Sequence, residues 1–250
     1  MFVIGRNPVN EALKFNSRSI KKIVLLEGLS DSKIKEIIRI ADKNNISIDL
    51  KSKKDFEKIL DKKDKSEGVS QGVIAEVTEY KYADIDTILE KVKPKNDALL
   101  LILDEIQDPH NLGAVIRTSA AAGTDGIIVT EKNSAKVNHT VVKTSAGAVN
   151  HIDIVQSKNI YKTIEALKNA DFIVLGTSLN TKTSLYDMNF KGKYAIVLGN
   201  EGEGIRKNIL KLCDGLIKIP IADKIESLNV SVSAGVILFE ILRQRLRKEK

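Results

Sequence analysis

The chain from residue 99 onward alternates short apolar segments with helix-like segments, and this alternation restricts the possible folds more than any other feature. We expect strands at Leu99–Leu103, Gly126–Val129, His151–Val155, Phe172–Gly176, Tyr194–Leu198 and Leu216–Ile219. We expect helices at Asn111–Ala122, Val141–Ala148, Ile160–Asn169, Ile205–Leu212 and Val230–Leu246. Strands that alternate with helices in this way form a mainly parallel, doubly wound sheet, so we predict an α/β fold.

The first 77 residues predict a smaller α/β unit of their own. The expected strands are Ile20–Leu26, Ile46–Leu50 and Gly72–Val77, and the expected helices are Asn7–Phe15, Ser30–Lys43 and Lys53–Leu60. Residues 78–97 are polar, contain Pro94 and hold one weak helical segment, Ala83–Val92. We therefore predict an N-terminal domain at 1–77, a linker at 78–97 and a larger domain at 98–250.

The overall composition limits the partners and the location of the protein. The net charge is +7, which fits a polyanionic partner, although charge alone is more typical of a lysine-rich, solvated surface. The single cysteine, Cys213, excludes an internal disulfide and suits a reducing compartment. The first residues do not form a signal peptide, and no apolar run reaches the roughly 20 residues of a membrane span. We expect a cytoplasmic protein that has no contact with membranes.

Three of the expected strands are each followed by a polar loop and then a helix. The loops read D-E-I-Q-D-P-H-N after residue 103, G-N-E-G-E-G after residue 198 and S-L-N before the last helix. In open α/β sheets, ligands bind outside the carboxyl ends of the strands, so these loops are candidate sites. Each also has a structural explanation: Ser227 and Asn229 can cap a helix, glycines serve tight turns, and Arg117 can complete an ion pair.

Several common kinds of site have no support in the sequence. The three histidines and Cys213 are too scattered to form a metal-ligand set, so we expect no metal. There is no G-x-x-x-x-G-K-[ST] phosphate loop. The glycines at 199, 202 and 204 do not fit the G-x-G-x-x-G pattern of dinucleotide-binding folds.

Taken in this order, the three loops resemble the three motifs of the SpoU-type RNA ribose 2′-O-methyltransferases, which belong to the SPOUT (α/β-knot) class. The resemblance covers about Leu99 to Leu246. It implies a deep trefoil knot in a mainly parallel α/β domain, S-adenosylmethionine as the methyl donor, and a homodimer formed through the catalytic domain. The N-terminal segments I-G-R-N-P-V-N-E-A-L and S-Q-G-V-I-A look like the substrate-binding domain of this family, which resembles small ribosomal proteins.

The resemblance also assigns site residues. Those implied for catalysis are Arg117, Asn111, Glu201, Ser227 and Asn229. Those implied for cofactor binding are Thr177, Ser178, Leu179, Leu198, Gly199, Asn200, Ile219 and Leu228. The candidate RNA contacts in the N-terminal domain are Arg6, Lys21 and Lys22.

The family's usual account makes Arg117 the base that removes the ribose 2′-OH proton. A guanidinium group stays protonated in proteins, so we favour a different role for it. We expect Arg117 to pair with the phosphate of the target and to stabilise the developing alkoxide, while that phosphate or a water molecule assists removal of the 2′-OH proton. Asn111 would orient Arg117 or the ribose, and Glu201 would hold an arginine or a polar edge of the ligand. Ser227 and Asn229 would contact the nucleotide or fix Arg117.

The expected function is therefore 2′-O-methylation of a ribose in structured RNA. The extra N-terminal domain resembles that of the two-domain ribosomal members, which implies a guanosine of large-subunit (23S) ribosomal RNA. The alternatives are a transfer RNA ribose methyltransferase, a non-catalytic RNA-binding protein that retains the fold, and a small-molecule α/β enzyme.

Overall fold

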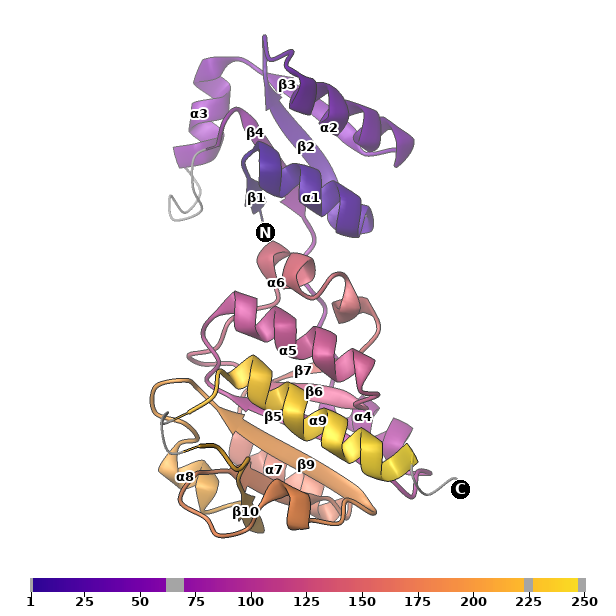
Figure 1. Cartoon of the computed structure of the whole chain (residues 1–250). Coiled ribbons are helices and arrows are strands. Elements are labelled where there is room, and N and C mark those ends of the chain that lie inside the picture. The colour runs from indigo at the N-terminus through magenta and orange to yellow at the C-terminus, as the bar shows by residue number, and fades with distance from the viewer. Residues whose placement is uncertain (1, 62–69, 223–226, 247–250) are drawn as a thin grey trace. The chain divides into compact units, whose positions relative to one another are not determined.

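In the computed structural model, the described residues are 2–61, 70–222 and 227–246. The chain divides into two compact units, Met1–Tyr80 and Lys81–Lys250 (Figure 1).

The N-terminal unit is built on a four-stranded sheet in the order β1-β4-β2-β3. Strands β2 and β3 run parallel, whereas β4 runs antiparallel to both β1 and β2. The sequence did not predict β1, which has only three residues. The strands are β1 (Phe2–Ile4), β2 (Ile20–Leu26), β3 (Ser47–Lys51) and β4 (Val73–Val77), and the helices are α1 (Arg6–Asn16), α2 (Ser32–Lys43) and α3 (Lys53–Asp61).

Helices cover both faces of this sheet because the side chains of its strands alternate in direction. Ile23 and Leu25 of β2 belong to the larger apolar cluster, which includes residues of α1 and α2. Val24, between them, belongs to a second cluster with Phe56 of α3. Successive residues of a strand point to opposite faces, so β2 is buried on both sides.

The C-terminal unit contains the predicted parallel sheet. Its strand order is β10-β8-β9-β5-β6-β7, and each neighbouring pair runs parallel. The central strand, β5, is fully buried along its length, as expected for a strand covered on both faces. The strands are β5 (Ala98–Asp104), β6 (Gly126–Thr130), β7 (Ile154–Ser157), β8 (Ile173–Thr177), β9 (Lys193–Gly199) and β10 (Gly215–Ile217).

The helices of this unit lie on both faces of the sheet, which makes a three-layer α/β domain (Figure 1). Helices α5 and α9 pack against each other, and α9 also contacts β9. Apolar residues of α4 and α7 form a cluster with the side chains of β5 and β9 that point to the other face. The helices are α4 (Ile85–Val92), α5 (Pro109–Ala121), α6 (His139–Thr144), α7 (Ile160–Asn169), α8 (Lys207–Leu210) and α9 (Val230–Leu246).

The segment that we interpreted as a linker, 78–97, is mostly integrated into the C-terminal unit. Ile88 and Val92 of α4 are fully buried in the core cluster of that unit. Ala83 forms an isolated parallel bridge with Val155, and its N–H donates to the carbonyl of Ile154 at 2.9 Å. The helix predicted at Ala83–Val92 is thus present as α4, but the polar composition gave no sign of its burial or of the contact that shields the edge strand β7.

Several other elements are shorter than the sequence suggested, among them the helix expected at Val141–Ala148, which ends at Thr144. The strand expected from His151 begins only at Ile154, because residues Ala148–Asn150 form a 3-10 turn. The helix expected at Ile205–Leu212 is reduced to α8.

The knot implied by the resemblance stays a prediction. Among the described residues, no helix has both the length and the apolar character that a membrane crossing requires.

A substitution at Gly113 tests the packing of α5 against α6. A Cβ atom at this position would lie 1.8 Å from Thr144 Oγ1 and 3.0 Å from the Val141 carbonyl oxygen. We expect Gly113→Ala to lower the free energy of unfolding by about 1–3 kcal/mol, because relief of the clash requires movement of α6. Urea denaturation measures this change. In the control Gly215→Ala, the added methyl meets only the end of the Leu175 side chain at 3.3 Å, so its effect should be smaller. Equal stability of both variants would contradict the packing argument.

Candidate active site

The carboxyl ends of β8, β9 and β10 border a cavity of about 560 Å³. We call it the donor cavity, after the methyl donor that the resemblance implies. Apolar side chains and loop backbone make up much of its wall, and the start of α9 closes one side. All of the residues that the resemblance implied for cofactor binding line it: Thr177, Ser178, Leu179, Leu198, Gly199, Asn200, Ile219 and Leu228. Ser227 lines it as well. The structure therefore brings these eight residues together, although they come from three separate loops.

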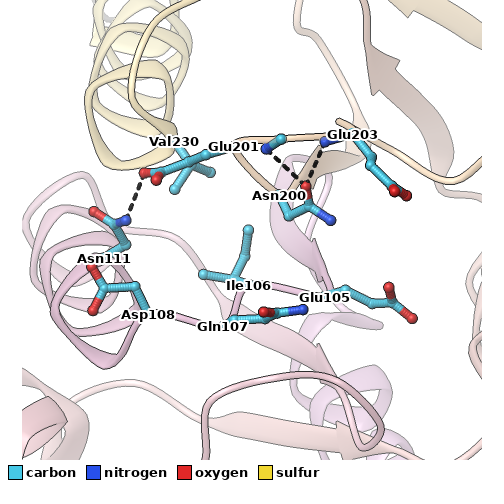
Figure 2. Close-up of a pocket in the computed structure, with 10 residues that line it drawn as sticks. Glu105, Ile106, Gln107, Asp108, Asn111, Asn200, Glu201, Glu203 and Val230 are labelled. Atoms are coloured by element: carbon cyan, nitrogen blue, oxygen red, sulfur yellow. Dashed lines mark hydrogen bonds between the residues drawn. The ribbon is translucent and has the colours of Figure 1, made fainter.

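A second cavity, of about 480 Å³, adjoins the first, and we call it the polar cavity (Figure 2). Both cavities are lined by residues 200–203 and by Val230, so the same loop forms a wall of each. The remaining lining comes from the loop after β5 and from the start of α5: Glu105, Ile106, Gln107, Asp108 and Asn111. The sequence indicated this loop as a candidate site, but of these five residues only Asn111 was assigned a role.

Three of the residues implied for catalysis meet beside this shared wall. Glu201 Oε1 accepts hydrogen bonds from Asn111 Nδ2 at 2.6 Å and from Asn229 Nδ2 at 2.5 Å. Asn229 Nδ2 also lies 3.1 Å from Asn111 Oδ1, which accepts from it. We refer to Asn111, Glu201 and Asn229 as the Glu201 cluster. It joins the starts of α5 and α9 to the loop that follows β9.

Asn229 has two functions at once. Its Oδ1 accepts from the backbone N–H of Ser231 at 2.9 Å and from Ser231 Oγ at 2.6 Å, so it caps the start of α9. Its Nδ2 is used for the contact with Glu201. The cap predicted for Asn229 is therefore present, whereas its role towards a nucleotide stays a prediction and its Nδ2 contacts Glu201 and Asn111 rather than Arg117. Ser227 is exposed, and within the described part of the chain no hydrogen bond joins it to the cluster.

The loop that carries Glu201 folds tightly on itself. Asn200 Oδ1 accepts from the N–H groups of Gly202 at 3.0 Å and Glu203 at 2.7 Å, and the N–H of Gly204 donates to the Asn200 carbonyl at 3.1 Å. The side chain of Asn200 therefore shapes the loop as well as lining the donor cavity. At Gly199, a Cβ atom would stand 2.0 Å from the carbonyl carbon of Gly204, so only glycine fits there.

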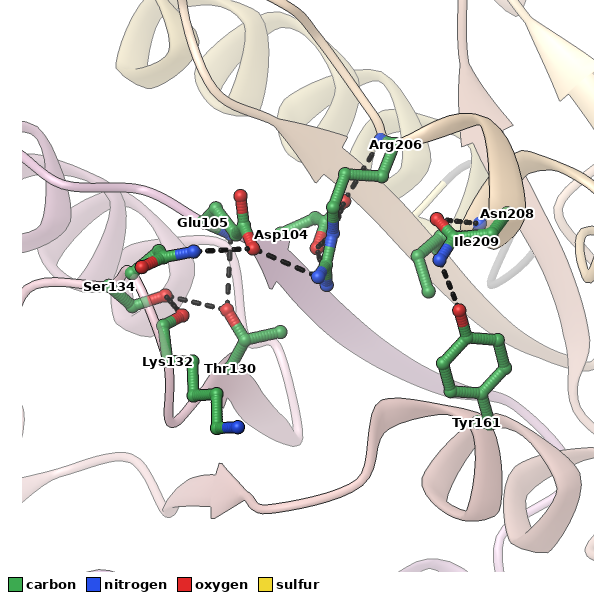
Figure 3. A network of polar contacts seen from close by, with 10 residues as sticks. Asp104, Glu105, Thr130, Lys132, Ser134, Tyr161, Arg206, Asn208 and Ile209 are labelled. Carbon is green, nitrogen blue, oxygen red and sulfur yellow. Dashed lines mark hydrogen bonds and ion pairs between the residues drawn. The ribbon is translucent and has the colours of Figure 1, made fainter.

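An ion pair next to this loop was missed at the sequence level. Asp104, the last residue of β5, is fully buried and accepts from the guanidinium of Arg206 (Figure 3). Hydrogen bonding to Asp104 is the main cause of a raised pKa of Arg206. Arg206 also pairs with Glu105 at 2.9 Å, and Glu105 has a positive φ of 57°. The available signal was an acidic residue at the end of a wholly apolar strand.

Arg117 is not brought to the Glu201 cluster. It follows Asn111 by six residues on α5, which places it about 9 Å further along the axis and on another face. Its side chain is exposed, and it lines neither cavity. In the part of the chain that the structure describes, no hydrogen bond or ion pair holds its guanidinium. Its neighbour Thr118 lies where α9 passes α5, close to Gly235.

The candidate RNA contacts of the N-terminal unit differ in their surroundings. Arg6 pairs with Asp31 at 2.6 Å, and its Nε donates to the carbonyl of Gln71 at 2.9 Å. Lys22 Nζ lies at 3.8 and 3.9 Å from carboxylate oxygens of Asp49 and Glu76. Lys21 is exposed, and no interaction of its side chain is found within the described residues. Of the three, Lys21 is the one whose charge is most available to a phosphate.

Two family models match the chain. Residues 98–239 match the SpoU rRNA Methylase family, and residues 2–83 match the RNA 2′-O ribose methyltransferase substrate-binding domain. A putative TrmH family tRNA/rRNA methyltransferase of Bacillus subtilis, YacO, is 35% identical over 98% of this chain and 96% of its own length. Its counterpart in Staphylococcus aureus strain COL is 37% identical over 97% of this chain and 96% of its own.

A solved structure shares the fold. It is the SpoU methyltransferase AviRb of Streptomyces viridochromogenes in complex with the cofactor AdoMet, with a TM-score of 0.68. The alignment covers 98% of this chain and 90% of AviRb at 22% identity. At this identity the likeness shows the fold alone.

A substitution at Gly199 tests the geometry of the loop that both cavities share. We expect Gly199→Ala to separate Gly199 from Gly204, because the added methyl cannot occupy the same space as the backbone. The amide protons of residues 202–204 should then exchange faster with solvent, and the free energy of unfolding should fall by about 1–3 kcal/mol. Hydrogen exchange and urea denaturation measure the two effects. Wild-type exchange in this loop would show that the close contact is not required.

Proposed function

Because the chain belongs to the SpoU rRNA methylase family of RNA methyltransferases, we propose that it transfers a methyl group from S-adenosylmethionine to a ribose 2′-oxygen of structured RNA. The observation that carries the proposal is the pair of adjoining cavities separated by the Glu201 loop. A methyl transfer needs two ligands held side by side, and this arrangement offers a chamber for each. The most suitable substrate is a guanosine of large-subunit ribosomal RNA.

The lining of the donor cavity suits S-adenosylmethionine. When bound, this compound supplies a methyl group on a positively charged sulfur. Leu179, Leu198 and Ile219 give apolar contacts for an adenine ring, while the loop backbone offers hydrogen bonds to its edge. Gly202 leaves space for close approach, since a Cβ atom there would meet only Asn200 Oδ1 at 3.7 Å. Glu201 and Glu203 place negative charge on the side facing the polar cavity, where a cationic sulfur is stabilised.

The polar cavity suits the ribose and base of the target nucleotide better than it suits a phosphate group. Its carboxylates, Glu105, Asp108, Glu201 and Glu203, repel an anion but accept hydrogen bonds from ribose hydroxyls and base amino groups. Guanine presents adjacent N–H donors on its pairing edge, which is consistent with the proposed guanosine. We propose that the Glu201 cluster orients the ribose, since Asn111 and Glu201 both line the polar cavity.

We propose that Arg117 acts across a homodimer. Val232, Phe239 and Leu246 on α9 are about half exposed or more, at 50%, 49% and 59%, and their spacing of seven residues puts them on one face of the helix. A second copy of this chain would cover such an apolar stripe by an isologous contact. Thr118, the neighbour of Arg117, lies close to Gly235 of α9. We propose that in the dimer the exposed guanidinium of Arg117 faces the other copy and contacts the phosphate of the target.

The first test is transfer of labelled methyl from S-adenosylmethionine to unmodified ribosomal RNA and to unmodified transfer RNA. We expect label in ribosomal RNA, in a dinucleotide that resists alkaline hydrolysis, because a methylated 2′-oxygen cannot attack the neighbouring phosphate. Arg117→Ala should lower kcat/KM at least about 100-fold, as expected for loss of a group that stabilises developing negative charge. Lys162→Ala, which removes an exposed cation from α7 on the other face of the sheet, is the matched control.

The other outcomes separate the alternatives. Label in transfer RNA alone would support the proposed reaction but show that the substrate is transfer RNA, in line with the tRNA/rRNA designation of the relatives. Label that is lost on alkaline hydrolysis would exclude the ribose 2′-oxygen as acceptor. RNA binding without transfer would favour a non-catalytic RNA-binding protein, and Lys21→Ala should then weaken that binding.

The dimer has its own test. We expect sedimentation to show a dimer for the wild type and a monomer for Phe239→Glu at micromolar concentration. In an isologous interface each substitution counts twice, and two buried phenylalanines at about 1.5–3 kcal/mol each correspond to at least a 100-fold weaker association. Leu50→Glu replaces a leucine of similar exposure in the N-terminal unit and should remain dimeric. A monomeric wild type would overturn the dimer and, with it, the role of Arg117 across the interface.

A further inference from the structure

The loop that carries Glu201 begins and ends at the same buried carboxylate. Asp104 is paired with Gly199 in the parallel ladder between β5 and β9, where the loop starts. Arg206 ends the loop directly before α8, and both its backbone and its side chain donate to Asp104 (Figure 3). The chain therefore leaves the sheet at Gly199, next to Asp104, and contacts Asp104 again at Arg206 after six intervening residues.

The contacts between the two residues are multiple and directional. Arg206 N donates to Asp104 Oδ2 at 3.0 Å, Nε donates to Oδ1 at 3.0 Å, and Nη2 donates to Oδ1 at 2.5 Å. Asp104 is 0% exposed, so water does not compete for its oxygens. Charge-assisted hydrogen bonds of this kind fix geometry as well as adding stability. The remaining amino group, Nη1, reaches Glu105 in the wall of the polar cavity.

The tip of the loop has no comparable anchor. Asn200 binds Gly202 and Glu203, but these hydrogen bonds lie within the loop and would move with it. Among the described residues, the hydrogen bonds that connect the tip to α5 and α9 are those of the Glu201 side chain. The position of the whole loop relative to the sheet therefore depends on its two ends.

We infer that Asp104 and Arg206 are positioning residues that set where Glu201 meets Asn111 and Asn229. The pair touches neither proposed ligand directly. It holds the loop so that one wall serves both cavities. The kinetic part of this inference rests on the proposed function, whereas the effect on the loop does not. Without the pair, the loop would keep its internal turn but shift against α5 and α9.

The test compares Arg206→Gln and Arg206→Lys with the wild type by two measurements. The first is hydrogen exchange at the amides of residues 199–206, and the second is methyl transfer to RNA. We expect Arg206→Gln to speed exchange in this loop and to lower kcat/KM about 100-fold, the effect of a displacement near 1 Å. Arg206→Lys should restore part of both, because an ammonium can still reach one oxygen of Asp104.

Two controls separate positioning from general stability. Lys168→Gln breaks the ion pair between Lys168 and Asp214, at 2.6 Å in the same unit but lining neither cavity, and should change neither measurement. The double variant Asp104→Asn with Arg206→Gln leaves no unpaired buried charge, so it folds even if Arg206→Gln does not. It should show the same faster exchange.

The inference fails if loop exchange in the Arg206 variants matches the wild type, or changes no more than in Lys168→Gln. It also fails if activity falls while loop exchange is unchanged, because Arg206 would then act on the substrate itself. A wild type that methylates no RNA would refute the proposed function, but the exchange measurement would still decide whether Asp104 and Arg206 hold the loop.

Discussion

One oxygen atom of Glu201 joins the three parts of the candidate site. It accepts from Asn111 and Asn229, which stand at the starts of two helices and are 118 residues apart in the chain. Two amide donors on one carboxylate oxygen form a charge-assisted contact in which neither helix can shift without loss of a hydrogen bond. The parallel sheet makes this contact feasible, because parallel strands deliver their following loops to a common edge. The loop that carries Glu201 lines both cavities.

Much of the fold was predictable, because apolar segments in a parallel sheet are distinctive. Each of the six strands expected in the C-terminal unit is present, and the resemblance indicated which loops follow the important ones. The predictions of structure failed where the local composition was misleading. The polar residues around α4 concealed Ile88 and Val92, whose burial depends on a sheet assembled later in the chain. Likewise, β1 is too short for its alternation to be seen, and it exists only because β4 pairs with it.

The candidate site was predictable to a smaller extent. The resemblance indicated Asn111, Glu201 and Asn229, whose types and order match the family motifs, and the structure brings them together. It did not indicate Asp104 with Arg206, because a partner 102 residues away leaves no periodic or local pattern in a sequence. The six-residue spacing between Asn111 and Arg117 already places the two side chains on different faces of a helix. The packing of α9 on α5, in contrast, is known only from the structure.

The burial of α4 affects how the second unit can be handled in isolation. The family model begins at residue 98, but the compact unit begins at Lys81. A fragment cut at 98 would uncover the apolar cluster beneath Ile88 and remove the bridge from Ala83 to the edge strand β7. Unpaired strand edges promote self-association. A recombinant methylase domain should therefore start before Lys81, and insolubility of a shorter fragment would reflect the cut rather than any dependence on the N-terminal domain.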